Sequence, residues 1–346
     1  MNFREHVPLA PFTTFGIGGP ARWFVEVDTE STVLEAVAFA RERQLPLFVL
    51  GGGSNLLVSD EGFPGLVIRI ALRGVEFHRE AEDGVFEVAA GEDWDAFVSN
   101  AIERGYGSIE CLAGIPGTVG GTPVQNVGAY GQEVSETIES VRALDMNRGR
   151  FVDMSREDCG FSYRKSIFNT AERGRFIVTR VHYRLVFGAE SVVTYPDLKR
   201  YFKDRLALPT LAEVSNAVRS IRRQKGMLLV PGDPDCASAG SFFKNPVVAR
   251  EAFERIAGQS PTEVPSFPVG EERKIPAAWL LDQAGFHKGL VAGRAGISSR
   301  HSLALINRGG ASAGEMAALR DRIVAAVEAK FAIRLEQEPV WVGPVT

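Results

Sequence analysis

The sequence predicts an α+β protein with two lobes and a third, C-terminal region. Near the N-terminus, apolar strand-like runs alternate with amphipathic helical segments, which favours a small α/β lobe. From about Leu72 the residue pattern changes, and apolar and polar residues alternate in runs typical of strands. From about Pro209 the strongest signals are amphipathic helices separated by loops. These changes of pattern divide the chain at 1–72, 73–205 and 206–346.

The first region has a strand–helix–strand order. We expect a strand over Trp23–Val27, followed by a helix that Ser31 caps. Further strands are expected over Leu45–Leu50 and Gly65–Ile70. Pro46 lies near the start of its strand, where a missing donor is tolerated.

In the second region the pattern predicts a strand over Val85–Ala90, a helix over Asp93–Arg104, and strands over Ile138–Asp145 and Phe176–Val186. The last strand should have a basic face and an apolar face. The basic face holds Arg180, His182 and Arg184, and the apolar face holds Ile177, Val181, Tyr183 and Leu185.

The third region begins with an amphipathic helix over Thr210–Lys225. A loop rich in Pro, Gly and Asp follows over Met227–Ala239. Helices are expected over Ile275–Ala284 and Gly314–Phe331, and a terminal strand over Ile333–Val342.

Composition excludes several classes of protein. A net charge of −4 argues against general nucleic-acid binding. Three scattered cysteines without a CxxC pair argue against a disulfide framework or a zinc site. The five histidines lack metal-ligand spacing, so we expect no catalytic metal. With no signal peptide and no apolar run long enough for a membrane span, the expectation is a cytoplasmic protein that does not bind membranes.

Two glycine-rich segments are the most informative feature. The first, Gly51–Asn55, follows an apolar run, and the second, Gly114–Gly131, holds six glycines in eighteen residues. Glycine allows a ligand to lie directly against backbone N–H groups, so the pair favours a long phosphate-bearing cofactor. The first loop is not GxGxxG, so a Rossmann helix N-terminus fits poorly. Taken alone, the first loop is explained equally well as a plain strand-to-turn corner.

Other segments carry side chains suited to chemistry, each with a structural alternative. Gly240–Pro246 places a hydroxyl, an ammonium and an amide within five residues, or is simply a strand with two core phenylalanines. Arg164 lies among apolar residues and is either in a structural ion pair or a ligand for a carboxylate. Glu336 and Glu338 lie two residues apart and would share one face of the terminal strand. The structural alternative is that this face is simply exposed to solvent. Four basic residues lie at the end of the amphipathic helix: Arg219, Arg222, Arg223 and Lys225. They form either a solvated helix C-terminus, which the helix dipole favours, or part of a pocket for an anion.

Taken together, six segments in order resemble the UDP-N-acetylenolpyruvoylglucosamine reductase family nearly end to end. They are Thr13–Gly18, Leu50–Asn55, Ala113–Glu133, Tyr163–Phe168, Gly240–Pro246 and Leu303–Asn307. The resemblance implies a two-lobed FAD-binding domain of the vanillyl-alcohol-oxidase type plus a C-terminal α/β substrate-binding domain with a catalytic strand. FAD is implied to be noncovalent, with lobe 1 at 1–72, lobe 2 at 73–205 and the substrate domain at 206–346. Val193–Leu198 resembles the tyrosine loop of the longer type of this family, in which Tyr195 closes over the substrate.

The resemblance also implies roles for individual residues. Arg164, Ser241 and Glu338 are implied to be catalytic, and Glu336 stays open as an alternative because the chain reads Leu335-Glu-Gln-Glu-Pro-Val340. Tyr195, Lys225, Asn245 and His301 are implied to bind substrate, Lys225 less securely because an extended 226–234 loop follows it. The residues implied to bind the cofactor are Gly51, Gly52, Gly53, Ser54, Asn55, Gly114, Ile115, Pro116, Gly117, Thr118, Gly120, Gly121, Gln125, Asn126, Gly128, Ala129 and Tyr130.

The implied reaction is NADPH-dependent reduction of the enolpyruvyl group of UDP-N-acetylglucosamine enolpyruvate, which gives UDP-N-acetylmuramate for peptidoglycan synthesis and hence cell wall biogenesis, cell shape and cell division. Hydride reaches C3 through FAD, and Ser241, polarised by Lys244 or a water, gives a proton to C2. The protein is expected to be a monomer that takes this small-molecule substrate. Two other hypotheses remain: an oxidase of the same flavin fold, with Cys111 as a covalent tether, or a nonenzymatic sugar-nucleotide or flavin-binding protein.

Overall fold

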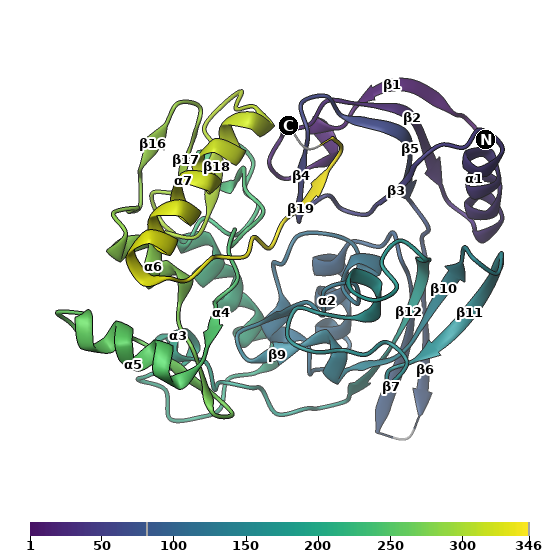
Figure 1. The fold of residues 1–346 in the computed structure, drawn as a ribbon. Helices are drawn as coiled ribbons and strands as arrows, with labels where there is room; N and C mark the ends of the chain where they lie inside the picture. The colour runs from purple at the N-terminus through teal and green to yellow at the C-terminus, as the bar shows by residue number, and fades with distance from the viewer. Residues whose placement is uncertain (81, 345–346) are drawn as a thin grey trace. The chain divides into compact units, whose positions relative to one another are not determined.

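A computed structural model describes residues 1–80 and 82–344 of the chain. The chain folds into two compact units, each made of several segments (Figure 1). Unit 1 comprises Met1–Val7, Ala21–Gly53 and Pro64–Gln224. Unit 2 comprises Pro8–Pro20, Ser54–Phe63 and Lys225–Thr346. The first glycine-rich loop therefore begins in unit 1 and continues in unit 2.

A four-stranded sheet carries the N-terminal part of the chain, in the order β1 (Arg4–Pro8), β2 (Pro20–Val27), β5 (Phe63–Ile70) and β3 (Leu47–Leu50). Helix α1 (Glu30–Glu42) connects β2 with β3, which pairs in parallel with β5. The strands match the expected ones, but Ser31 does not cap the helix. Thr29 is the N-cap, because its hydroxyl accepts from Thr32 N while the Thr32 hydroxyl accepts from Thr29 N.

The second sheet of unit 1 is five-stranded and antiparallel. Its order is β11 (Arg150–Ser155), β10 (Ile138–Asp145), β12 (Phe176–Val186), β7 (Asp83–Ala89) and β6 (Val75–Glu80). The expected two faces of β12 are confirmed. Ile177, Val181, Tyr183 and Leu185 are all 0% exposed, whereas Arg180, His182 and Arg184 are partly exposed.

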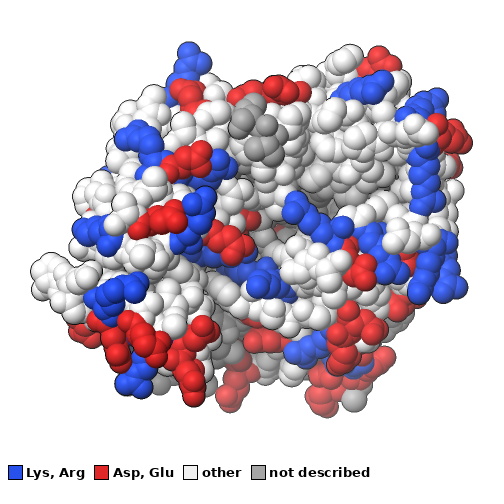
Figure 2. Space-filling model, in the orientation of Figure 1, with Lys and Arg blue, Asp and Glu red and all other residues white. Residues whose placement is uncertain are grey.

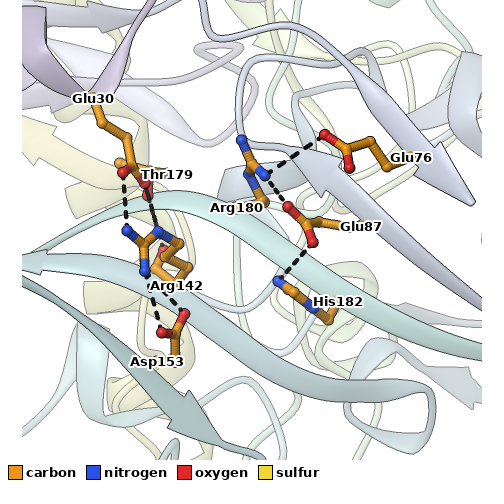
Figure 3. A network of polar contacts seen from close by, with 8 residues as sticks. All are labelled: Glu30, Glu76, Glu87, Arg142, Asp153, Thr179, Arg180 and His182. Atoms are coloured by element: carbon orange, nitrogen blue, oxygen red, sulfur yellow. Dashed lines mark hydrogen bonds and ion pairs between the residues drawn. The ribbon is translucent and has the colours of Figure 1, made fainter.

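The outer face of this sheet carries a network of charged side chains (Figure 3). Arg142 on β10 makes two hydrogen bonds with Glu30 on α1, at 2.8 and 3.1 Å, and also bonds Asp153 on β11. Further along the face, Arg180 pairs with Glu87 on β7. The network joins α1 to the sheet and thereby connects the two parts of unit 1.

Helices α2 (Trp94–Glu103), α3 (Pro196–Tyr201) and α4 (Leu211–Gln224) complete unit 1, together with the short strands β8 (Gly128–Ala129) and β9 (Gln132–Glu133). Trp94, Phe97 and Val98 of α2 pack into one core with the buried face of the five-stranded sheet and with Val214, Val218 and Ile221 of α4. Single 3-10 turns lie at Ala10–Phe12, Glu110–Leu112 (η2), Val119–Gly121, Val134–Glu136, Ile167–Asn169 and Pro234–Cys236.

Unit 2 is built from short strands and three helices. Its strands are β4 (Leu56–Val58), β13 (Val247–Val248), β14 (Phe267–Val269), β15 (Glu272–Lys274), β16 (Val291–Ala292), β17 (Ala295–Ile297), β18 (Leu305–Asn307) and β19 (Val340–Val342). Its helices are α5 (Arg250–Gln259), α6 (Ala277–Gln283) and α7 (Ala313–Phe331). Phe242, Phe243, Leu280 and Met316 lie in its core.

The expected terminal strand over Ile333–Val342 is largely wrong. Only Val340–Val342 is regular, and it pairs in parallel with β4. Pro339 lacks an N–H donor and precedes this strand, which agrees with its expected place at an irregularity. Glu336 and Glu338 therefore lie on an irregular segment and not on a strand.

Within the described ranges, no helix is both long and apolar enough to cross a membrane. The same residues contain no group of three or more His, Cys, Asp or Glu side chains that could hold a metal ion. Lys and Arg side chains are interspersed with Asp and Glu on the face that Figure 2 shows.

Candidate functional site

The two glycine-rich loops meet inside unit 1. A Cβ atom added to Gly52 would lie 2.5 Å from the Gly117 Cα and 3.1 Å from the Thr118 N. A Cβ on Gly51 would lie 2.8 Å from the Thr118 hydroxyl oxygen. Real Cβ atoms do not approach other atoms this closely, so only glycine allows the two backbones to come together here. The sequence predicted a shared function for the two loops, and their contact supports it.

The second loop is fixed to the sheet and helix beneath it. Gly120 N donates to the Ala90 carbonyl at 2.9 Å, and Trp94 N donates to the Gly117 carbonyl at 3.1 Å. The buried Thr122 and Tyr183 hydroxyls bond each other at 2.7 Å. Backbone and side-chain bonds thus give a loop with so many glycines one defined conformation.

Two arginines of α4 hold the start of this loop. Arg222 is buried and donates from Nε to the Gly114 carbonyl at 2.9 Å. Burial lowers the pKa of Arg222 from its ordinary value. Arg219 bonds Asp95, whose Oδ1 also accepts from Gly114 N at 2.6 Å. Both polar groups of Gly114 are therefore tied to α2 and α4, so Arg219 and Arg222 do not form the solvated helix end that the sequence also allowed.

Arg164 lies against the far part of the same loop. It has a left-handed backbone (φ 58°), and its Nη2 donates to the Gly128 carbonyl at 2.8 Å. Asn126, 1% exposed, donates to the Ser162 carbonyl at 3.1 Å and to Glu133 at 2.8 Å. The glycine loop and the turn that carries Tyr163 and Arg164 thus form one structure.

Cys111 precedes the second loop and is buried, at 0% exposed. Burial, with a smaller contribution from the Glu110 charge, raises the pKa of the Cys111 thiol to about 12. The thiol therefore keeps its proton at neutral pH and donates to the Val192 carbonyl at 3.4 Å. A protonated, buried thiol is a poor nucleophile, which disfavours Cys111 as a covalent tether.

Unit 2 brings together the segments that carry Ser241 and the two glutamates. Glu338 N donates to the Phe242 carbonyl at 2.8 Å, and Lys244 N donates to the Glu336 carbonyl at 2.9 Å. An antiparallel bridge pairs Phe243 with Gln337 between them. Phe242 and Phe243 are buried, as the structural alternative for this segment predicted, and their burial fixes Ser241 and Lys244 on either side.

The side chains around this pairing distinguish the two glutamates. Lys244 forms an ion pair with Glu336, whose side chain is 69% exposed. Glu338 is less exposed, and its carbonyl accepts from Asn55 Nδ2 at 3.3 Å. Val340 N in turn donates to the Asn55 carbonyl at 2.9 Å. Within unit 2, Glu338 therefore lies beside the continuation of the first glycine-rich loop, whereas Glu336 neutralises a lysine.

The remaining predicted substrate residues have structural contacts in this conformation. Asn245 Oδ1 accepts from Ala277 N at 2.9 Å, at the start of α6. His301 Nδ1 accepts from Leu303 N at 3.1 Å. The loop after Lys225 is fixed by Asp233 and Asp235, which both bond Arg300. Tyr195 is 42% exposed, and its ring contacts that of Tyr130 with centroids 5.3 Å apart.

Pattern reading missed the residues that support these loops. The sequence pattern does not connect Asp95 or the two arginines of α4 with Gly114, and it assigns no role to Glu110. Glu110 is the only acid in the run Ile109–Ala113 and is 0% exposed. A lone acid in an apolar run is the signal that could have found it, because carboxylates are seldom buried without a purpose.

Comparison with known proteins identifies the class first. The model of the FAD binding domain matches residues 21–155, which include both glycine-rich loops through Gly131. The chain is thus an FAD-dependent oxidoreductase with mixed α/β structure, as the sequence predicted. The model of the UDP-N-acetylenolpyruvoylglucosamine reductase C-terminal domain matches residues 233–342.

The chain belongs to the UDP-N-acetylenolpyruvoylglucosamine reductase family. It is 45% identical to the Streptomyces coelicolor reductase over 97% of this chain and 89% of the relative. It is 43% identical to the Thermobifida fusca reductase over 99% of this chain and 98% of the relative. The crystal structure of the Thermus caldophilus reductase is similar with a TM-score of 0.67 and 29% identity, over 99% and 100% of the two chains.

The residues present in unit 1 fit FAD. Because neither Gly52 nor Gly117 carries a side chain where the two loops meet, a ligand can lie directly against the backbone there. The Thr118 hydroxyl oxygen is buried and lacks a hydrogen-bond partner among the residues described. A buried polar atom without a partner calls for a ligand group that can bond it. The phosphate oxygens of a dinucleotide can accept hydrogen bonds from such a hydroxyl and from the backbone N–H groups of the loop.

Proposed function

We propose that this chain catalyses the NADPH-dependent reduction of UDP-N-acetylglucosamine enolpyruvate to UDP-N-acetylmuramate in peptidoglycan precursor synthesis. Membership of the reductase family supports the reaction. The structural observation that carries it is the antiparallel pairing of Phe242–Lys244 with Glu336–Glu338. Ser241 directly precedes the first of these segments, so the pairing holds the backbone beside Ser241 against the segment that carries the two glutamates.

Bound FAD would supply the hydride transfer between NADPH and the substrate. The cofactor-binding residues proposed from the sequence would hold it, with Gly51–Gly53, Gly117 and Thr118 supplying backbone donors. The buried and protonated Cys111 thiol supports noncovalent binding of FAD.

The chain's own side chains then have to manage charge and protons. Adding hydride at C3 of the enolpyruvyl group builds negative charge on C2 and on the carboxylate, which preorganised donors stabilise. Arg164 would pair with that carboxylate through its planar guanidinium. Ser241 would give its proton to C2, and Glu338, in preference to Glu336, would assist as the catalytic glutamate.

Substrate binding is assigned to four further residues. Tyr195, Lys225 and Asn245 would contact the uridine diphosphate part of the substrate, and His301 would also bind the substrate. Because Asn245 Oδ1 already accepts from Ala277 N, its Nδ2 group is the part that would donate to the ligand. This proposal keeps the functional division 1–72, 73–205 and 206–346, and the protein would act as a cytoplasmic monomer that supports cell shape and division.

An anaerobic absorbance titration tests the function. Purified protein should show an oxidised flavin band that NADPH bleaches and that UDP-N-acetylglucosamine enolpyruvate restores. Denaturation should release the FAD into the soluble fraction. A band that NADPH bleaches but the enolpyruvyl substrate does not restore would reject the proposed substrate while leaving the flavoprotein class intact.

A further inference from the structure

Glu110 is a buried carboxylate that the proposed chemistry does not use. It lies in η2, just before the second glycine-rich loop, and is 0% exposed. Its Oε1 accepts from Gln132 Nε2 at 2.9 Å and from Val192 N at 3.3 Å. Its Oε2 is also buried and has no hydrogen-bond partner within 1–80 and 82–344. An acceptor left in this state is costly, so a hydrophobic residue would serve this position better if packing were its whole purpose.

The two donors come from segments far apart in the sequence. Gln132 directly follows the second glycine-rich loop, and its Oε1 accepts from Cys111 N at 2.8 Å. Val192 begins the stretch Val192–Tyr195, which we call the tyrosine segment. The Cys111 thiol donates to the Val192 carbonyl at 3.4 Å, so both backbone polar groups of Val192 are held by neighbours in η2.

The rest of the tyrosine segment follows the end of the glycine loop. A Cβ on Gly131 would lie 3.0 Å from the Thr194 hydroxyl oxygen. The rings of Tyr130 and Tyr195 meet edge to face, with an interplanar angle of 80°. The buried Glu110 therefore fixes the tyrosine segment at Val192. The other end of the segment reaches the surface, where Tyr195 is 42% exposed.

We propose that Glu110 is a positioning residue for Tyr195, holding the tyrosine segment against the end of the cofactor loop through Gln132 and Val192. The proposal rests on the proposed function, in which Tyr195 binds the substrate. Without the carboxylate acceptor, the Val192 N–H loses its partner and the segment gains conformational freedom. Substrate binding would then have to order the segment again, which weakens binding more than it slows turnover.

Three variants separate this role from packing. Glu110→Met keeps the volume of the side chain but removes the acceptor, whereas Glu110→Gln keeps an amide oxygen that can accept both bonds. Glu103→Met is the matched control, because Glu103 is exposed on α2. For each protein we would measure kcat and KM for the enolpyruvyl substrate, and the rate of tryptic cleavage at the exposed Lys199, Arg200 and Lys203 in the absence of substrate.

We expect Glu110→Met to raise KM about tenfold or more, with kcat within about threefold of the unsubstituted chain, as loss of the hydrogen bonds from Gln132 and Val192 implies. Cleavage after the tyrosine segment should be about fivefold faster, because proteolysis follows local opening. Glu110→Gln should restore both values to within about threefold of the original, and Glu103→Met should change neither. In a Tyr195→Ala background, Glu110→Met should leave KM unchanged, because two residues that act through one contact are not additive.

Unchanged KM and cleavage in Glu110→Met would overturn the proposal, as would a full further rise of KM in the Tyr195→Ala background. An equal rise of KM and of the cleavage rate in Glu110→Met and Glu110→Gln would also reject the proposal. It would show that any substitution at this position disturbs the site, whether or not the hydrogen-bond acceptor is kept. If Glu110→Met fails to fold, Val192→Pro removes the N–H group that donates to Glu110 and carries the same expectations. If the unsubstituted chain does not turn over the enolpyruvyl substrate, the proposed function fails, while the cleavage rates still decide whether Glu110 positions the segment.

Discussion

Ser241 gains its place from the residues around it. The hydroxyl itself is a weak acid, so its proposed role depends on position and on polarisation by neighbours. Phe242 N donates to the Leu303 carbonyl at 2.8 Å, and the Phe242 carbonyl accepts from Glu338 N. Lys244, which the sequence offered as the polarising group, is paired with Glu336. The proton-donating role of Ser241 is therefore open to a direct kinetic test.

Ser241→Ala should leave the bleaching of the flavin band by NADPH nearly unchanged and slow its return with the enolpyruvyl substrate by about 10²–10⁴-fold, since only that half of the reaction needs the proton. Stopped-flow absorbance under anaerobic conditions measures both halves on one sample. A similar loss in both halves would show that Ser241 supports the fold or the cofactor and not the protonation.

Arg164→Lys should lower kcat/KM for the enolpyruvyl substrate by about 10–100-fold, because an ammonium keeps the charge but loses the planar pair of donors. The substitution also removes the Nη2 bond to the Gly128 carbonyl. Steady-state kinetics with FAD content measured in parallel provides the test. Turnover equal to that of the original chain would mean that Arg164 does not hold the carboxylate.

Helix α1 is joined to the five-stranded sheet by charge. Burial raises the pKa of Glu30, but the hydrogen bonds from Arg142 and Thr179 outweigh it, and the net pKa is lowered. The Glu30 and Arg142 side chains are only 26% and 31% exposed, so solvent screens this pair less than a surface pair (Figure 3). The first part of unit 1 thus depends on a polar contact as well as on the apolar core.

Glu30→Ala should reduce the free energy of unfolding by about 1–3 kcal/mol, because it leaves the Arg142 guanidinium and the Thr179 hydroxyl with one acceptor fewer. Chemical denaturation followed by circular dichroism measures this change. Glu35→Ala, at an exposed position on the same helix, is the control and should change stability much less. Equal effects of the two substitutions would assign the loss to helix propensity.

The turn after β10 is expected to be sensitive to acid. The hydrogen bond from Arg175 lowers the pKa of Asp145 to about 2. A carboxyl group whose folded pKa is depressed contributes stability above its unfolded pKa and loses it as pH falls through the folded pKa. The thermal midpoint should therefore fall between about pH 4 and pH 2, and Asp145→Asn should flatten this dependence. Asp28→Asn, exposed before α1, should keep it.

Regular elements could be predicted better than the segments that carry chemistry. The alternation in Phe176–Val186 and the periodicity in Gly314–Phe331 depend on local burial, and both elements formed as expected. The Ile333–Val342 segment has similar residues, but its backbone bonds go to Phe242 and Asn55, far away in the sequence. The loop contacts of Gly52 and Glu110 are of the same long-range kind, so sequence motifs indicated that the glycine loops matter but not what holds them.

At the scale of the whole molecule, the cofactor is expected to stabilise the protein. FAD that binds only the folded chain should add about 4 kcal/mol at a thousandfold excess over its Kd. Adding FAD to the apoprotein should therefore raise its Tm, as measured by differential scanning fluorimetry at a wavelength free of flavin emission. Gly52→Ala should abolish this rise, because its Cβ would clash with Gly117. Gly258→Ala, at an open position on α5, should preserve it, and an equal loss there would reject the contact as the cause.

The pairing of β4 with β19 has a consequence for biosynthesis. Leu56–Val58 leaves the ribosome long before its partner strand Val340–Val342 is translated. Until then β4 has an unsatisfied edge, and Asn55 beside it lacks the Glu338 and Val340 contacts that hold it. Unit 2 therefore cannot complete this pairing before Val342 has been translated, and a ribosome that stalls earlier should release a polypeptide that chaperones and proteases recognise as incomplete.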